Sequence, residues 1–287
     1  MSPDRAATRL ARALVPRPLR NWLRAPRQSA AWAWDEVQHL CGLERTVAMR
    51  PGWSIAGHPL ASRIGYSFLL AEAEQAAELD AFIAECRPGM TLVDAGAHFG
   101  VFTLAALHYG GPTARAVAVD PSPTACRIMA IQFRRNGVDA RARIVPACVG
   151  ARTGVQPMVA VGVIASGYCV PPAVHHVGRE VTVCEATTLD DLVRRFDLRP
   201  THVKLDVEGA EAAALRGGAG LLSSPSPPLL FIELHNDLIR RAGGDPAEVV
   251  ALLEELRYAP FAPEGPPLDR AALLGRPVVR LIARPSR

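Results

Sequence analysis

Two short acidic segments, far apart in the chain, carry the residue types that could do chemistry. The first reads Asp94-Ala-Gly-Ala-His-Phe-Gly100, and the second reads Lys204-Leu-Asp-Val-Glu-Gly-Ala-Glu211. Each follows a short apolar run and precedes a helical pattern, which predicts the loop at the carboxyl end of a parallel strand. In an open α/β sheet such loops bind ligands, because backbone N–H groups and helix N-termini face the crevice there.

The spacing of the glycines in the first segment narrows the choice of ligand. A dinucleotide-binding loop reads G-x-G-x-x-G, whereas this segment has glycines only at positions 96 and 100. A nicotinamide oxidoreductase is therefore disfavoured. Asp94, directly before the loop, suits a ligand with a cationic amine rather than a pyrophosphate, whose charge a carboxylate repels. S-adenosylmethionine is such a ligand, and Gly96 would let the backbone approach it closely.

Side chains that could move a proton lie in the second segment and in the next apolar run. Asp206 and Glu208 share one face of their strand end at period two, and Glu233 and His235 share one side of the following strand. Methyl transfer from a sulfonium needs an aligned acceptor and a base that takes the proton from an alcohol. All four side chains are candidates for that base, and we favour His235 or Glu208.

Lys204 is the only lysine in a chain that otherwise uses arginine for its cationic side chains. A compact ammonium is therefore predicted to be needed here, since lysine and arginine are not interchangeable where a point charge is required. The predicted catalytic set is accordingly Lys204, Asp206, Glu208 and His235. The alternative for Lys204 is a structural ion pair beneath the cofactor site.

The elements that must position these residues alternate between strands and helices. Apolar runs bounded by glycine and proline predict the strands, and helical periodicity with capping residues predicts the helices. The predicted strands are 90–93, 116–119, 143–145, 203–206, 229–234 and 278–283, and the predicted helices are 71–86, 122–137, 188–196, 210–215 and 246–256. Residues 155–183 are predicted to be an irregular insertion with hairpin strands. The alternation predicts a doubly wound, mainly parallel sheet.

Six motifs in order, between about residues 74 and 236, resemble one known family. They are Asp94–Gly100, Asp120-Pro121, Asn136-Gly137, Thr188–Leu192, Lys204–Glu211 and Phe231–His235. Together they resemble the FkbM family of S-adenosylmethionine-dependent methyltransferases. The resemblance implies a class I methyltransferase fold, which is Rossmann-like with a seven-stranded sheet, and O-methylation of secondary metabolites, polyketides or saccharides.

The resemblance also implies roles for individual residues in the cofactor site. Asp94, Gly96 and Gly100 would hold the methionine end of S-adenosylmethionine, and Asp120 would accept hydrogen bonds from its ribose hydroxyls. The family more often has asparagine where His98 stands and glutamate where Asp120 stands, so His98 could be simply a scaffold of the loop. The predicted cofactor-binding residues are Asp94, Gly96, Ala97, His98, Gly100, Asp120 and Ser122.

A divalent metal ion could bind at the same strand ends. An acidic residue of the second segment, with Glu233, His235 and Asn236, is similar to the metal corner of catechol-type O-methyltransferases, where the ion lowers the pKa of the substrate hydroxyl. Acid-rich strand ends are common without a metal. A metal is therefore not favoured, and no metal ligand is predicted.

Charge is distributed unevenly along the chain. Residues 1–34 hold seven arginines against one aspartate, so this stretch carries +6 while the whole chain carries only +4. The remainder is therefore slightly acidic and is not predicted to bind nucleic acid. We divide the chain into an Arg/Pro-rich N-terminal arm and lead-in, residues 1–70, and a methyltransferase domain, residues 71–287. The arm could bind an acidic partner or surface.

We expect a cytoplasmic methyltransferase acting on a small-molecule acceptor. No 18-residue stretch is continuously apolar, so no transmembrane segment is predicted, and the six cysteines lack the spacing of metal ligands, as reduced thiols of a cytosolic protein would. Two alternatives remain. The chain could be a non-catalytic cofactor-binding partner of a biosynthetic enzyme, or, third in order, a nicotinamide oxidoreductase.

Overall fold

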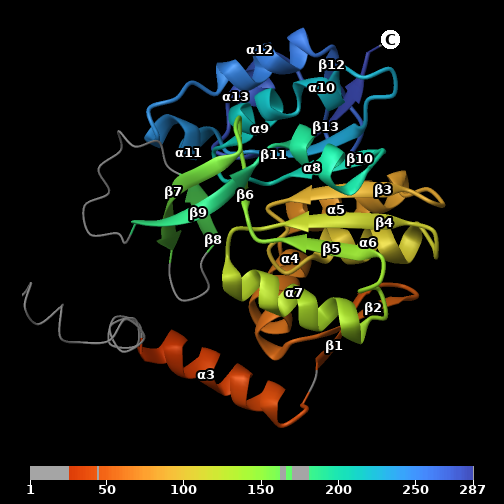
Figure 1. Ribbon diagram of the computed structural model, residues 1–287, viewed down its shortest axis with the longest axis vertical. Helices are drawn as coiled ribbons and strands as arrows, with labels where there is room; N and C mark the ends of the chain where they lie inside the picture. Colours follow the sequence, from red (N-terminus) through yellow and green to blue (C-terminus); the bar gives the residue numbers. More distant parts are fainter. Residues whose placement is uncertain (1–25, 44, 162–165, 170–180, 287) are drawn as a thin grey trace, which may run out of the picture.

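A seven-stranded sheet forms the centre of the computed structural model, which describes residues 26–43, 45–161, 166–169 and 181–286 (Figure 1). The strand order is β12-β13-β11-β10-β3-β4-β5. Five neighbouring strands are parallel, whereas β13 is antiparallel to β11 and β12 is antiparallel to β13. The bounds are β3 Thr91–Ala95, β4 Arg115–Val119, β5 Ala142–Val145, β10 His202–Leu205, β11 Leu229–Leu234, β12 Tyr258–Phe261 and β13 Val279–Pro285.

Helices cover both faces of this sheet, which confirms the predicted doubly wound class. One core cluster packs Phe82, Leu104 and Ile128 from α5, α6 and α7 against the sheet, and a second packs Leu189 and Leu215 from α8 and α9 on the other face. The bounds are α5 Ala73–Glu85, α6 Val101–Tyr109, α7 Pro123–Arg135, α8 Leu189–Phe196, α9 Glu211–Gly217, α10 Ala219–Leu222, α11 Asn236–Arg241, α12 Ala247–Glu255 and α13 Arg270–Leu274.

The order of connections places a crevice between β3 and β10. The chain runs outward from β3 through β4 to β5 and then returns to β10 on the other side of β3. At such a reversal the loops that follow the two strands diverge, and ligands bind between them. Both acidic segments singled out from the sequence lie at this place.

Local signals account for most of the element boundaries. The Ser122 hydroxyl accepts a hydrogen bond from Ala125 N at 3.2 Å and caps α7, and the Thr188 hydroxyl caps α8 through Asp191 N at 3.0 Å. The strand β12 was not among the predicted strands. Its sequence contains Pro260, which argues against a central strand, and β12 indeed lies at the sheet edge.

A second, four-stranded sheet contains most of the described part of the predicted insertion. Its order is β6-β9-β7-β8, with β7 antiparallel to both β8 and β9. The bounds are β6 Cys148–Val149, β7 Gly154–Val161, β8 Ser166–Cys169 and β9 Val181–Thr187. The expected hairpin strands are therefore present, and residues 170–180 lie outside the described residues.

The segment that precedes the sheet packs on it through apolar side chains. It comprises α3 Pro26–Leu40, a hairpin of β1 Arg45–Arg50 and β2 Trp53–Gly57, the π-helix η1 Ala61–Tyr66, and α4 Ser67–Ala71. Trp53, Ile55 and Tyr66 belong to the same core cluster as α5, α6 and α7. The division at residue 70 stays a prediction, and residues 1–25 of the predicted arm lie outside the described residues. Within the described ranges, no helix is long and apolar enough to cross a membrane.

Candidate functional site

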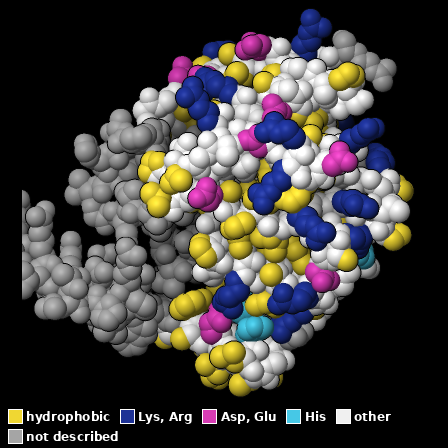
Figure 2. Space-filling view, viewed as in Figure 1, with side chains coloured by type: hydrophobic (Ala, Val, Ile, Leu, Met, Phe, Trp, Pro, Cys, Tyr) yellow, Lys and Arg dark blue, Asp and Glu magenta, His cyan; other side chains and the backbone are white. Residues whose placement is uncertain are grey.

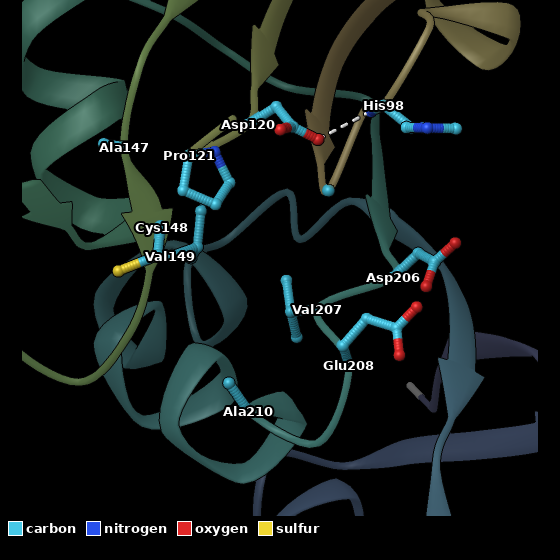
Figure 3. Close-up of a pocket in the computed structure, with 11 residues that line it drawn as sticks. His98, Asp120, Pro121, Ala147, Cys148, Val149, Asp206, Val207, Glu208 and Ala210 are labelled. Atoms are coloured by element: carbon cyan, nitrogen blue, oxygen red, sulfur yellow. Dashed lines mark hydrogen bonds between the residues drawn. The ribbon is translucent and has the colours of Figure 1, made fainter. Parts of the chain in front are cut away.

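A cavity of about 130 Å³ opens at the carboxyl ends of β3, β4 and β10 (Figure 3). It joins the two acidic segments with residues that follow β4 and β5. Among the residues that the structure describes, its lining includes three carboxylates and one imidazole but no lysine or arginine. It consists of Gly96, His98, Asp120, Pro121, Ala147, Cys148, Val149, Asp206, Val207, Glu208 and Ala210. The site is therefore suited electrostatically to a cation and not to a pyrophosphate.

A second cavity of about 260 Å³ shares part of this lining. Gly96, His98, Asp206 and Glu208 border both cavities. The second one extends toward η1 and α5, where its other polar side chains are Tyr66, Gln75, Glu78 and Glu233. Asp206 and Glu208 thus lie where the two cavities meet.

Gly96 is required where the β3 and β10 loops touch. Its φ is +80°, and a Cβ atom at this position would lie 1.7 Å from the carbonyl oxygen of Asp206. The amides of Gly96 and Ala97 both donate to Val119 O, at 2.8 and 3.0 Å, which holds the loop against β4. Gly100, with φ +74°, begins α6. The predicted loop geometry therefore depends on glycine for a steric reason.

Asp120 is held by backbone donors at the edge of the first cavity. Its Oδ2 accepts a hydrogen bond from His98 N at 2.8 Å (Figure 3). Its Oδ1 accepts one from Ser122 N, also at 2.8 Å. Burial raises its pKa to about 6. Each carboxylate oxygen keeps a second lone pair for a ligand hydroxyl. Ser122 itself is buried as the cap of α7 and does not line either cavity.

His98 has an unusual position in the loop. Its φ is +48°, in the left-handed region, and its ring stacks on Phe99 with 3.7 Å between centroids. Burial lowers its pKa to about 4, so the ring is neutral at pH 7. Its Nε2 is buried and has no hydrogen-bond partner among the described residues. A buried imidazole nitrogen beside a cavity is open to a ligand contact, while the backbone amide supports Asp120 as a scaffold would.

Asp94 and Lys204 lie beneath the cavities rather than in their walls. Asp94 is 1% exposed, and its Oδ2 accepts hydrogen bonds from the amide and the hydroxyl of Thr103, at 3.1 and 2.7 Å. Lys204 is also 1% exposed, and its Nζ lies 3.0 Å from Glu78 Oε1 and 5.0 Å from the centroid of the Phe102 ring. The structure therefore does not bring Asp94, Ser122 and Lys204 into contact with the cavities.

His235 lies at the centre of four carboxylates. Its Nδ1 is 2.9 Å from Glu211 Oε1, and Glu211 is completely buried. Its Nε2 is 3.7 Å from both Asp206 Oδ1 and Glu233 Oε1, and 4.0 Å from Glu208 Oε2. Burial alone would lower the pKa of His235, but the Glu211 hydrogen bond and the surrounding charges raise it to about 9. The imidazole is therefore protonated at pH 7 and cannot accept a proton there.

The acids of this cluster respond differently to their surroundings. Burial and the charge of Asp206 raise the pKa of Glu233 to about 7, although Arg280 Nη2 donates to Glu233 Oε1 at 2.6 Å. Burial also raises the pKa of Glu208. Glu208 has φ +52°, a left-handed conformation that is uncommon for glutamate and typical of functional sites. Glu78, Glu211 and Arg280 were not in the predicted site. Only the fold brings Glu78 and Arg280 to it, whereas Glu211 ends the second acidic segment and was not given a role there.

A cation could bind beside His235, with acids of the second segment as its other ligands. Ligand atoms of Asp206, Glu208 and His235 all lie within 4.8 Å of one another. Asn236 instead donates to Leu273 O at 2.7 Å and to Arg276 O at 2.8 Å, so its amide is used to anchor the chain that follows α13. These bonds occupy the amide nitrogen of Asn236, whereas its Oδ1 is buried and has no hydrogen-bond partner among the described residues. A protonated His235 already supplies a positive charge among the carboxylates.

We expect His235→Gln to flatten the pH dependence of folding stability above pH 6.5. The pKa of His235 in the folded protein is raised from 6.5 to about 9. The contribution of its charge to folding stability is therefore fully present below pH 6.5 and is lost as the pH rises to 9. That loss amounts to about 3 kcal/mol in the free energy of unfolding. Urea unfolding of wild type and variant, with chelator at both ends of this range, measures the difference.

The matched control for this titration is the exposed His108. Burial lowers its pKa, so it is neutral throughout this pH range. His108→Gln should therefore keep the wild-type slope. Equal slopes in wild type and His235→Gln would show that His235 does not carry the charge assigned to it.

Comparison with known proteins identifies the family of the part of the chain that builds this site. Residues 94–260, more than half of the chain, match the family model described as the methyltransferase FkbM domain. A stretch of 59 residues is 44% identical to a ribosomal protein L11 methyltransferase from Pelotomaculum thermopropionicum, and it spans 21% of this chain but only 18% of that protein.

Solved structures similar to this one carry the names of methyltransferases. The precorrin-6y C5,15-methyltransferase from Geobacter metallireducens has a TM-score of 0.41 and 12% identity, covering 74% of this chain and 88% of that one. The O-methyltransferase from Bacillus cereus, in complex with SAH, has a TM-score of 0.40 and 12% identity, covering 72% and 77%. A putative rRNA methylase from Clostridium thermocellum has a TM-score of 0.45 and 9% identity, covering 74% and 97%.

Proposed function

Because the chain belongs to the FkbM methyltransferase family, we propose that it transfers the methyl group of S-adenosylmethionine to an oxygen of a small secondary metabolite, polyketide or saccharide. The observation that carries this proposal is the position of Asp206 and Glu208 where the two cavities meet. One cavity offers the contacts that the cofactor needs. The other offers space for an acceptor on the far side of the same carboxylates.

The residues of the first cavity fit this cofactor. Asp120 presents two acceptor oxygens to a ribose, and Gly96 leaves room for close approach of the ligand to the β3 loop. The cavity lining is anionic, which suits a sulfonium and an ammonium group. When bound, S-adenosylmethionine supplies an electrophilic methyl group on that sulfonium. His98 Nε2 is a further partner for a ligand donor, because the neutral ring can accept a hydrogen bond.

Glu208 is the proposed proton acceptor for the hydroxyl of the acceptor molecule. Its side chain is half-buried, it lines both cavities, and its raised pKa brings its basicity closer to that of a working general base. Figure 3 shows its carboxylate beside that of Asp206. His235, which we expected as an equally good base, is protonated at pH 7 and instead orients and balances these carboxylates. Lys204 acts through Glu78 as a positioning residue.

The negative charge of the cavities supports a small-molecule acceptor over a nucleic acid. The cavities present Asp206, Glu208 and Glu233 to an entering molecule, and phosphate groups of a nucleic acid would be repelled by them. The described residues that line the two cavities include no lysine or arginine to offset this charge. We therefore keep the prediction of no nucleic-acid partner, and a cytoplasmic location likewise stays a prediction.

Calorimetric titration of the purified protein with S-adenosylhomocysteine tests the proposal. We expect micromolar binding, no binding of NAD, and affinity at least about tenfold weaker in Asp120→Asn, which loses a charged acceptor. A nicotinamide oxidoreductase would instead bind NAD and not S-adenosylhomocysteine. Binding without any turnover across a screen of acceptors with methyl-labelled donor would favour the non-catalytic alternative.

Methyl transfer is expected to survive exhaustive chelation of divalent metals. The imidazolium of His235 lies among Asp206, Glu208 and Glu233, where a metal ion would otherwise compensate their charge. Turnover should be measured after dialysis against EDTA and again after Mg²⁺ is restored. If activity disappears on dialysis and returns with Mg²⁺, the metal-free assignment is wrong and Asp206, Glu208 and His235 are its first candidate ligands.

A further inference from the structure

The helix α3 packs on the body with its polar face. Asp35, which is 1% exposed, accepts hydrogen bonds at Oδ2 from Arg63 Nη2 at 2.6 Å and from Arg63 Nε at 2.9 Å. Glu36 pairs with Arg127 of α7, and its Oε1 lies 3.5 Å from His58 Nε2. These contacts attach the helix to η1, to α7 and to the turn after β2. The side of α3 that faces the protein is thus held by these charged and polar groups and by Trp32, which packs against the core.

The opposite face of α3 is apolar and exposed. Trp34 is 62% exposed, Val37 45%, and Leu40 81%, and Leu43 just after the helix is 58% exposed. Trp34, Val37 and Leu40 are three residues apart, which places them on one side of the helix, and Leu43 follows its end. The exposed residues between 30 and 43 include no charged side chain. Figure 1 shows α3 at the lower edge of the molecule, and Figure 2 shows apolar side chains gathered at that end.

The distribution of apolar and charged side chains on α3 departs from the usual amphipathic pattern, because Asp35 is buried while Trp34, Val37 and Leu40 are exposed. A surface helix of a soluble domain buries its apolar stripe and exposes its charges. Four of the six large apolar side chains that are exposed in the described chain belong to α3 and its end, namely Trp34, Val37, Leu40 and Leu43. Contiguous apolar patches of this kind typically mark sites of contact with another surface.

The charge of the sequence that precedes the helix indicates the charge of the surface that α3 would contact. Seven arginines lie between positions 5 and 27 of the sequence, of which Arg27 is in the first turn of α3, and Asp4 is the only acid in residues 1–34. Two copies of this segment would repel each other across a homodimer interface. An anionic surface would attract it, and apolar residues together with cationic ones are the combination that binds helices to lipid headgroups.

We propose that α3 lies in the plane of an anionic lipid bilayer, with Trp34, Val37 and Leu40 at the boundary between headgroups and acyl chains. The N-terminal arginines bind lipid phosphates, and the ion pairs of Asp35 and Glu36 hold the catalytic domain against the helix. The apolar face of α3 is short, so it does not anchor the protein without the arginines. The arginines do not anchor it without the apolar face, and both are therefore needed. The attachment is peripheral and reversible.

Co-sedimentation of the full-length protein with vesicles tests this proposal. Vesicles of phosphatidylcholine with phosphatidylglycerol should bind the protein, whereas vesicles of phosphatidylcholine alone should not, and added salt should weaken binding. The triple variant Trp34→Gln/Val37→Gln/Leu40→Gln should bind at least about tenfold more weakly. The variant Arg12→Gln/Arg17→Gln/Arg20→Gln should lose about fivefold per arginine, or roughly a hundredfold.

A matched control uses the other two exposed apolar side chains. Val155 and Val183, of β7 and β9, are 62% and 69% exposed, and Val155→Gln/Val183→Gln should bind vesicles as wild type does. All variants change exposed or N-terminal residues, and unchanged thermal unfolding confirms that they are folded. This test does not depend on the proposed reaction.

Three results would overturn the proposal. One is the absence of binding to anionic vesicles, and another is equal binding by the wild type and the α3 variant. The third is a concentration-dependent dimer in sedimentation equilibrium that the α3 variant abolishes while neither protein binds vesicles. That last result would identify the apolar face as an interface between copies of this chain.

Discussion

Replacement of Gly96 by alanine is expected to abolish binding of S-adenosylhomocysteine and to lower the free energy of unfolding by about 3 kcal/mol or more. The added Cβ would lie 1.7 Å from Asp206 O, so the β3 and β10 loops would have to separate. That separation moves Asp206 away from the place where the two cavities meet. Chemical denaturation and calorimetric titration of the variant measure the two effects.

Gly111→Ala separates the steric clash from the cost of the backbone conformation. Gly111 has φ +73°, close to the value at Gly96, but no heavy atom lies within 4 Å of a Cβ added there. This variant should lose only about 1 kcal/mol of stability and keep its affinity for the ligand. Similar losses in the two variants would mean that the close approach of the β3 and β10 loops is not needed for the site.

Replacement of Glu208 by glutamine is expected to reduce methyl transfer by about 10² to 10⁴-fold, the usual contribution of a general base. The amide has nearly the same shape as the carboxylate but cannot accept the proton of the acceptor hydroxyl. Binding of S-adenosylhomocysteine should be retained, because Asp120 and Asp206 keep the lining of the first cavity anionic. Turnover with methyl-labelled donor and calorimetry of the same variant measure the two quantities.

Glu255→Gln is the control for the loss of one carboxylate. Glu255 is exposed at the end of α12 and borders neither cavity. It should turn over at the wild-type rate. If Glu208→Gln does so too, Glu208 is not the base. The remaining carboxylates that border the second cavity are Glu78, Asp206 and Glu233.

Raised pKa values in the site also explain why its base is hard to choose from sequence. Glu208 and His235 were equally good candidates as residue types, since both can accept protons near neutral pH. The choice between them depends on Glu211, which is completely buried against His235 Nδ1, and on three more carboxylates within 4.0 Å of Nε2. These neighbours come from different elements, so their combined field exists only in the folded chain.

The same limit applies to Asp94 and Lys204. Both were predicted at strand ends, and both are there, but their side chains point to Thr103 and Glu78 beneath the cavities. Strand periodicity gives the face on which a side chain lies and not the partner that it meets. The partners belong to α6 and α5, and sequence distance gives no indication of these contacts.

The sequence by itself determined the alternation of strands and helices, the capping of α7 and α8, the need for glycine at position 96, and the family. These features depend on local signals: apolar period, cap residues, and loop residues that tolerate positive φ. Only the tertiary structure decided that His235 is protonated, that Lys204 pairs with Glu78, that β12 completes the sheet edge, and that α3 turns its apolar side outward. Each of these features depends on which residues, distant in sequence, pack together. Burial and the local electric field exist only when those residues surround a side chain in the folded protein.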